Sequence, residues 1–274
     1  MTTATVSLTR STGRSGVVAL SVVAVLAVIG VLAPWLAPDD PDAISLMDAH
    51  QGSSAEHLLG TDASGRDLAS RLIWGARSSL TGPLLVVLLA TVLGVAVAVV
   101  SAWRGGWFDA AVSRVVDVLF AFPGVLLAIL VVALFGAGLG MAVTALAISY
   151  VPYIARLVRG AALRERAQPY ITALTIQGVS GFSICVRHLL PNLMPLILAQ
   201  ATLTFGYAMV DLAALSFLGL GVQPPTADWG VMVSTGQPSI IEGFPQECLY
   251  AGALIVVVVA AFNLLGDRLE ERIR

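Results

Sequence analysis

Asp211 is the residue best placed to do chemistry, because it is a carboxylate within the long apolar run Leu193–Leu215. Ionisable groups in such runs usually face a cavity or a partner, so a proton relay or a cation site is one interpretation. The other interpretation is a carboxylate near the outer side of the membrane that has no reactive role. Such a carboxylate is hydrogen-bonded, or is neutralised by protonation. We expect the second, and the helices around Asp211 decide between them.

The other reactive side chains are dispersed along the chain. His50, His57 and His188 occur in three separate segments, which argues against a metal site within the chain. Cys185 and Cys248 are interpreted as structural thiols. The chain contains no lysine and therefore no Walker-type phosphate-binding loop, and it shows no nucleophile triad. We expect no catalytic residue, no cofactor and no metal in this chain.

The composition is that of a membrane protein, since 57% of the 274 residues are hydrophobic and only 12% are charged. Six apolar runs are long enough to suggest transmembrane helices. They are Val17–Leu36, Gly82–Ala102, Val118–Phe135, Leu139–Ile154, Leu193–Leu215 and Cys248–Leu265. A cleaved signal peptide is the alternative for the first run, but its length and the lack of a clear cleavage site favour a span. The predicted fold class is an all-α membrane protein with six transmembrane helices.

Six spans place both termini on one side, and the arginines indicate which side that is. Twelve of the fifteen basic residues fall on the side of the termini, whereas Arg66, Arg71 and Arg77 fall on the other. We therefore expect both termini to be cytoplasmic in a multi-pass protein of the cell membrane. The expected regions are a cytoplasmic tail 1–15, a transmembrane domain 16–274, outer loops 38–79 and 216–247, and a cytoplasmic loop 160–192.

The cytoplasmic stretch 168–192 predicts a helix, a glycine turn and a second helix. Pro169 suits the first position of a helix, Gly178 suits its end, and Ser180 suits the cap of a second helix that runs to a turn before Pro191. Apolar residues recur in the second helix, with Arg187 and His188 between them. The pattern fits either an interfacial helix on lipid headgroups or an element that docks into a cytoplasmic partner.

The spacing of this stretch resembles the EAA loop of ABC importer permeases, which favours the docking interpretation. Four positions match the loop's pattern, and three differ where glutamate, alanine and an aliphatic residue are usual. The matches are Ala173, Gly178, Leu190 and Pro191, and the differences are Thr172, Leu174 and His188. In that family the loop fits into a cleft on the ATPase subunit and transmits its closure to the spans.

Two outer segments resemble the permeases of the dipeptide, oligopeptide and nickel class. The segment 57–80 carries G-T-D-x-x-G-R-D, in which Asp62, Arg66 and Asp67 are expected to form a capped turn with an internal ion pair. The segment 215–230 contains Phe217, Leu218 and Trp229. There a short helix is expected at the outer mouth, with Trp229 at the headgroups, and a lipid-facing loop is the alternative.

The resemblance to the C-type subunit of dipeptide permeases implies a type I ABC importer (MetI-like) fold. It implies a sister permease that lies beside this chain in the lipid bilayer, and an extracytoplasmic solute-binding protein. It also implies two ATP-binding subunits, or one fused ATPase, that bind ATP and Mg²⁺. No nucleic-acid partner is expected. The implied cargo is a short peptide, with haem or nickel as alternatives. A proton-coupled secondary transporter using Asp211 is the alternative from another class, and an intramembrane enzyme would need paired catalytic residues inside the spans.

Overall fold

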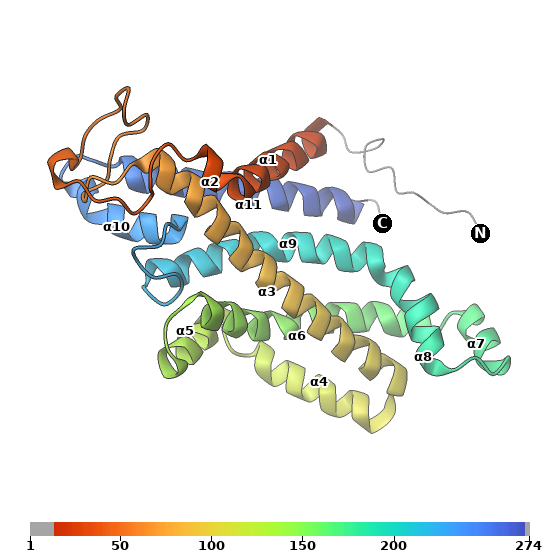
Figure 1. Cartoon of the computed structure of the whole chain (residues 1–274). Helices are drawn as coiled ribbons and strands as arrows, with labels where there is room; N and C mark the ends of the chain where they lie inside the picture. Colours follow the sequence, from red (N-terminus) through yellow and green to blue (C-terminus); the bar gives the residue numbers. More distant parts are fainter. Residues whose placement is uncertain (1–13, 272–274) are drawn as a thin grey trace.

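The computed structural model describes residues 14–271, which fold almost entirely into helices (Figure 1). Within this range the structure has no strand, only an isolated antiparallel bridge between Thr61 and Asp67. The helices are α1 (Arg14–Val31), α2 (Ala33–Leu36), the 3₁₀ turn η1 (Leu46–Asp48), α3 (Leu68–Arg104), α4 (Gly106–Phe120), α5 (Gly124–Phe135), α6 (Leu139–Arg166), α7 (Pro169–Ile176), α8 (Gly181–Ile184), the π-helical turn η2 (Cys185–Leu189), α9 (Leu190–Phe217), α10 (Trp229–Ile241) and α11 (Gln246–Glu271). The tail predicted for residues 1–15 lies almost wholly outside the described residues.

All six predicted apolar runs lie in helices. Four helices are long and apolar enough to cross a bilayer: α3, α6, the continuous segment Gly181–Phe217, and α11. The pair α4 and α5 meets the same criterion together, and α1 is a shorter apolar helix. The first run is not one helix, because α1 ends at Val31 and α2 restarts at Ala33 with Pro34 in its first turn. The predicted loop 38–79 is also shorter than expected, since α3 begins at Leu68.

The centre of the bundle is the contact between α3 and α6, with α9 alongside (Figure 1). Small buried residues of α3, among them Ala90, Ala98 and Ala102, face Ile154 and Val158 of α6 in one cluster. Small side chains let two helix backbones approach closely, and that close packing drives helix association in lipid. A second cluster joins α3 to α5, α9, α10 and α11.

The predicted span Val118–Phe135 is broken by a bend between two helices. α4 ends at Phe120, α5 begins at Gly124, and their axes are bent by 83°. Pro123 caps α5 in an extended conformation. Proline lacks the N–H that would continue the helix and disfavours helical geometry in the residue before it, so the chain turns here. The tight turn after α5 agrees with its glycines, because α6 follows at Leu139.

The predicted turn before Pro191 is absent, which corrects that prediction. Helix α8 passes through η2 into α9, so residues Gly181–Phe217 form one helix of 37 residues. In the π-helical turn, the N–H of Leu190 donates to the carbonyl of Cys185, five residues earlier. This wider turn accommodates Pro191, which would otherwise clash with the preceding turn of an α-helix.

The two described ends of the chain lie together. The guanidinium of Arg268, near the end of α11, donates to the hydroxyl of Ser15 at the start of α1 over 3.1 Å. Helices α1 and α11 also pack against each other along their length (Figure 1). Both ends of the described chain are therefore at the same end of the bundle, as an even number of spans predicts.

Candidate functional sites

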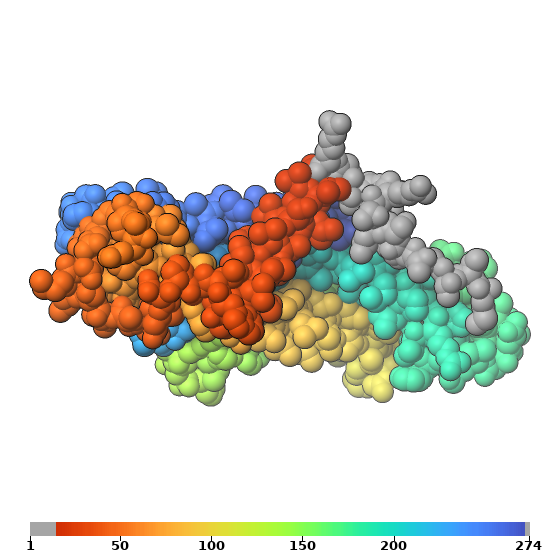
Figure 2. Space-filling view, turned by 45° about the horizontal axis from the view of Figure 1, so that its top comes forward, coloured from red at the N-terminus to blue at the C-terminus, as the bar shows by residue number. Residues whose placement is uncertain are grey.

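The two predicted functional regions lie at opposite ends of the molecule. Figure 2 shows the segment between α1 and α3 gathered at one end, and α7 and α8 projecting from the other. The turn at Asp62, with the start of α10 beside it, forms the predicted gate, and the stretch 168–192 is named the coupling loop here. The two regions are separated by the length of the bundle. Any communication between them runs through the long helices.

The coupling loop has the helix, turn and helix that its sequence predicts. Helix α7 begins at Pro169, and Gly178 adopts φ +78°, a left-handed conformation that favours glycine. Ser180 then caps α8 by accepting a hydrogen bond from the N–H of Ser183 at 3.3 Å. These three predictions from sequence are confirmed.

A polar cluster that the sequence analysis missed holds α7 in place. The Glu165 carboxylate, at the end of α6, accepts hydrogen bonds from the Tyr170 hydroxyl at 2.5 Å and from the Asn192 amide at 2.7 Å. Asn192 also donates to the Tyr170 hydroxyl at 3.0 Å. Helices α6, α7 and α9 are thereby joined through one carboxylate. Glu165 is the only acidic residue in 160–192, and this isolated carboxylate was the signal in the sequence that could have indicated the cluster.

The start of α8 is seated on the end of α3. Gly181 lies against the Trp103 indole, and the Arg166 guanidinium lies over the same ring at 5.4 Å from its centroid. Arg166 also donates to the carbonyl of Ala102 at 2.5 Å. A cation over an indole face is attracted by the ring quadrupole, so Arg166 holds Trp103 in the orientation that receives Gly181.

The residues predicted to form the coupling loop are mostly accessible. Thr172, Ala173, Gly178, Arg187 and Pro191 are exposed, whereas Leu174, His188 and Leu190 are half-buried. The same surface carries two large apolar side chains that the pattern did not single out, Ile176 at 82% exposure and Phe182 at 80%. Apolar side chains of this size at the tip of a projecting element are candidates for contact with another molecule.

At the opposite end, the predicted turn and ion pair are present. Arg66 Nε lies 2.6 Å from Asp62 Oδ2, and Asp62 Oδ1 accepts hydrogen bonds from the backbone N–H groups of Ser64 and Arg66. The turn is closed by a hydrogen bond from the N–H of Gly65 to the carbonyl of Asp62. These groups position the loop and hold no reactive geometry.

Arg71 is buried behind this turn and was not selected from the sequence. Its guanidinium donates to the carbonyl of Pro41 at 3.0 Å and lies 3.7 Å from Asp62 Oδ2. A longer contact of 3.4 Å reaches the carbonyl of Pro225. One buried cation thus joins three segments that are distant in sequence.

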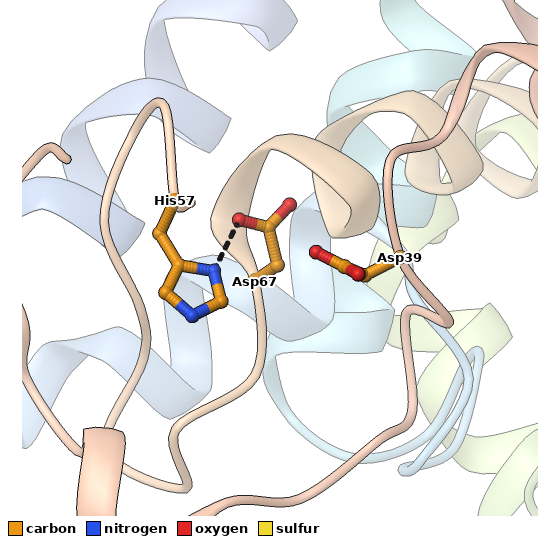
Figure 3. A group of neighbouring side chains, drawn as sticks. All are labelled: Asp39, His57 and Asp67. Carbon is orange, nitrogen blue, oxygen red and sulfur yellow. Dashed lines mark hydrogen bonds and ion pairs between the residues drawn. The ribbon is translucent and has the colours of Figure 1, made fainter. Parts of the chain in front are cut away.

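Asp67 caps α3 and lies within a group of three potential metal ligands (Figure 3). Its Oδ2 accepts from the N–H of Ser70 at 2.7 Å, and its Oδ1 is 3.1 Å from His57 Nδ1. Asp39 lies on the far side of Asp67 and is exposed. The histidines are indeed dispersed, but the sequence argument overlooked carboxylates brought next to one of them. The contacts of Asp67 are those of a helix cap, which explains its burial without a metal.

Trp229 is buried completely and does not lie at the headgroups, so that prediction was wrong. Its indole N–H donates to the carbonyl of Leu72 at 3.0 Å, which fixes the start of α10 against α3. The neighbouring Asp228 caps α10 through the N–H groups of Gly230 and Val231. The short helix predicted within 215–230 is absent, because residues 218–228 are not helical and α10 begins only at Trp229. A tryptophan in an outer loop suggests an interface position, but its polar group has a backbone partner here.

Asp228 also receives a hydrogen bond from the Ser79 hydroxyl at 2.7 Å. Ser79 Oγ in turn accepts a hydrogen bond from the backbone N–H of Trp229 at 2.9 Å. Burial raises the pKa of the Asp228 carboxyl, and these hydrogen bonds oppose that rise. Nearby, the carbonyl of half-buried Phe217 accepts from Ser234 at 2.8 Å, while Leu218 is exposed.

Asp211 stands apart from the other residues of the predicted gate. Its Oδ2 accepts a hydrogen bond from the Tyr150 hydroxyl of α6 at 2.6 Å. It lines a cavity beside the bend between α4 and α5, together with Tyr153 and Ser149. The expected hydrogen bond is therefore present, but its setting is a cavity that opens to the surface beside Phe122, away from the turn at Asp62.

Comparisons with known proteins agree with this arrangement. Residues 90–274 match the family described as "Binding-protein-dependent transport system inner membrane component". The dipeptide transport system permease protein DppC of Alkalihalophilus pseudofirmus is 38% identical over 258 residues, which cover 94% of this chain and 84% of that protein. The glutathione transport system permease protein GsiD of Escherichia coli is 38% identical over 91% of this chain and 82% of its own length.

A putative peptide transport system permease protein of Brucella abortus is 40% identical over 94% of this chain and 86% of its own length. Among solved structures, an inward-facing MetNI methionine ABC transporter matches with a TM-score of 0.61 and 21% identity, over 74% of this chain and 96% of the matched chain. At that identity the likeness concerns the fold, which is that of a type I ABC importer permease. The chain belongs to the family of inner membrane components of binding-protein-dependent transport systems.

Proposed function

We propose that this chain is one of two permease subunits that enclose the pathway of an ATP-driven importer for short peptides. The names of its relatives support this cargo, since they describe dipeptide, glutathione and putative peptide transport systems. They do not favour haem or nickel as the cargo. They also do not favour a proton-coupled transporter, because they belong to binding-protein-dependent systems.

The observation that carries the proposal is the exposed apolar surface of the coupling loop. Ile176 and Phe182 project from an element that is firmly seated on α3 and α6 through Trp103 and Glu165. Burying these apolar side chains in the cleft of a folded partner is favourable because it removes them from water, and the rigid base lowers the entropy cost of binding. We assign the partner as the ATPase, which binds ATP and Mg²⁺ for the complex.

The remaining assignments follow from charge and position. The end with α7 and α8 is rich in arginine and is taken as cytoplasmic, together with both termini. The end with η1, Asp62 and α10 then faces outward and receives the solute-binding protein. A homologous sister permease completes the pathway, and the ATPases are two subunits or one fused chain.

The test compares the recovery of partner subunits with a tagged permease co-expressed with its neighbouring genes. Ile176→Asp places a charge in the proposed ATPase contact and is expected to reduce ATPase recovery at least about tenfold, as for other buried apolar anchors. Ile241→Asp is the matched control, because Ile241 is 92% exposed at the other end of the molecule. It is expected to leave ATPase recovery unchanged.

Cargo is tested separately by uptake of labelled alanyl-alanine into cells that express the complete set of subunits and lack other peptide importers. We expect ATP-dependent uptake that disappears with Ile176→Asp. Normal ATPase recovery with Ile176→Asp would contradict the docking assignment, and absence of dipeptide uptake by a complete, assembled complex would contradict the peptide assignment.

A further inference from the structure

A cavity of about 290 Å³ lies where the helix pair α4 and α5 is bent. Helix α6 contributes Tyr150 and Tyr153 to its wall, and α9 contributes Asp211. Phe120, the last residue of α4, and Phe122, within the break, add two exposed aromatic rings to the wall. The cavity therefore combines one carboxylate with four aromatic rings, two from α6, one from the end of α4 and one from the break after it.

Asp211 is the only charged residue in the described lining of this cavity. Tyr150 donates to Oδ2, and among the described residues no donor contacts Oδ1. None of the ion pairs in the described part of the chain includes Asp211. Arg156 lies over the Phe120 ring, but its charge is paired with Asp117. The carboxylate is thus half-buried without a cation of its own.

Such a site is suited to a cationic ligand. A carboxylate withdrawn from water is costly unless a positive group compensates it, and aromatic faces add attraction for the same group. A divalent metal ion is a poor match, because it requires several oxygen or nitrogen ligands and only one carboxylate is present. A single ammonium group needs one carboxylate and a few neutral acceptors, which the hydroxyls of Tyr150 and Ser149 supply.

The break in the helix gives the cavity access to the pathway. Residues Ala121, Phe122 and Pro123 are exposed, and their backbone is not helical. Irregular backbone at membrane depth is stable only against protein or a water-filled space, since lipid cannot satisfy its polar groups. Under the proposed function, the pathway runs along this exposed, non-helical face, where a solute reaches Asp211 directly.

We propose that Asp211 binds the terminal ammonium group of the peptide during its passage, which rests on the proposed peptide import. Nearly every peptide with a free N-terminus carries this charge at neutral pH, since the α-amino pKa is about 7.7 to 8.0. The cavity volume accommodates the first residue of a peptide, so side chains further along remain in the pathway. Asp211 thereby selects for a free N-terminus while tolerating different sequences.

The experiment uses the complete permease and ATPase complex in nanodiscs, without the solute-binding protein, so that only the membrane subunits discriminate. Val125→Cys introduces a thiol in the cavity wall, in a background with Cys185→Ala and Cys248→Ala. The rate of maleimide labelling is measured against increasing alanyl-alanine or N-acetyl-alanyl-alanine. We expect alanyl-alanine to protect the thiol at a concentration at least about tenfold lower than the acetylated peptide, the ratio expected for one compensated charge.

Asp211→Asn is expected to abolish this preference. Asp267→Asn is the control, because Asp267 is an exposed aspartate on α11 outside the cavity. Equal protection by the two peptides in the complex with native Asp211, or an unchanged preference in Asp211→Asn, would overturn the proposal. The first comparison needs no change at Asp211, so it decides the matter even if Asp211→Asn prevents assembly. Uptake of labelled alanyl-alanine with the binding protein, measured in parallel, separates failure of this site from failure of peptide import itself.

Discussion

Gly181 and Trp103 lie so close that a β-carbon added to Gly181 would come within 2.4 Å of the indole nitrogen. Neither residue belongs to the pattern by which the coupling loop was identified. The contact joins the first residue of α8 to the end of α3, the helix at the centre of the bundle. The position of the loop is therefore determined by a contact that permits only glycine.

Gly181→Ala is expected to displace either Trp103 or the start of α8. We expect a loss of about 1 to 3 kcal/mol in the free energy of unfolding, typical of overpacking in a close contact. Thermal unfolding of the purified complex measures it. Gly160→Ala, in an open position on α6, is the control and is expected to be neutral or slightly stabilising. Equal stability of the two variants would contradict the constraint.

Arg71→Gln is expected to destabilise the outer end strongly. The change removes a buried cation and leaves the buried carboxylate of Asp62 with less compensation, which costs about 3 to 5 kcal/mol. Limited proteolysis of segment 38–67 and thermal unfolding both report the loss. Arg77→Gln serves for comparison, because Arg77 is exposed on the same helix. A small effect at Arg71, similar to that at Arg77, would show that the buried cation is not needed.

Stability at the start of α10 is expected to depend on pH through Asp228. Its folded pKa is raised above the unfolded value of about 3.9, so its contribution is complete below about pH 4 and is lost as pH rises through the folded pKa. Asp228→Asn keeps an oxygen for the helix cap and is expected to remove this dependence. Thermal unfolding of both proteins, followed from about pH 4 upward to about pH 8, measures the difference. A wild-type protein that instead gains stability relative to Asp228→Asn as pH rises would contradict the sign.

The contact between α4 and α6 is expected to depend on charge pairing. Arg159 Nε donates to Asp109 at 2.6 Å, and a second guanidinium nitrogen pairs with the same carboxylate. Asp109→Arg is expected to destabilise the bent pair by about 1 kcal/mol or more through repulsion. The double change Asp109→Arg with Arg159→Asp is expected to recover most of that loss. Failure of the double change to recover stability would indicate that orientation matters more than charge.

Much of the fold was predictable, because lipid imposes simple requirements on a chain. Apolar runs must be helical when no water can satisfy the backbone, so the six runs were readily located. Local signals were also reliable at Pro169, Gly178 and Ser180, since each acts through its own backbone geometry or cap. These features depend on residues that are close in sequence.

The structure departs from the sequence predictions where proline and tertiary contacts act together. Pro123 breaks its span, whereas Pro191 is absorbed by a π-helical turn within a continuous helix. The residue type is the same in both cases, so proline alone does not tell a break from a continuous helix. Trp229 was misplaced for a related reason, because its partner at Leu72 lies far away in sequence.

The residues that define the cavity were only partly predictable. Asp211 was evident as a carboxylate in an apolar run, but Tyr150 lies 61 residues earlier and no local pattern connects the two. Glu165 and Arg71 were missed because ordinary charged residues at helix ends attract no notice. The burial of Arg71 and the several partners of both residues appear only once the helices are packed.

The continuous helix Gly181–Phe217 has a mechanical consequence. At 1.5 Å per residue the axis of this helical rod is about 55 Å long. Gly181, which lies against Trp103, is at one tip, and Phe217, whose carbonyl accepts a hydrogen bond from Ser234, is at the other. Asp211 is fixed to the same rod. A tilt of about 5° about one tip would sweep the other through about 5 Å, roughly one helical turn. We expect this helix to bend at the π-helical turn, because the backbone hydrogen bonds there already span five residues instead of four.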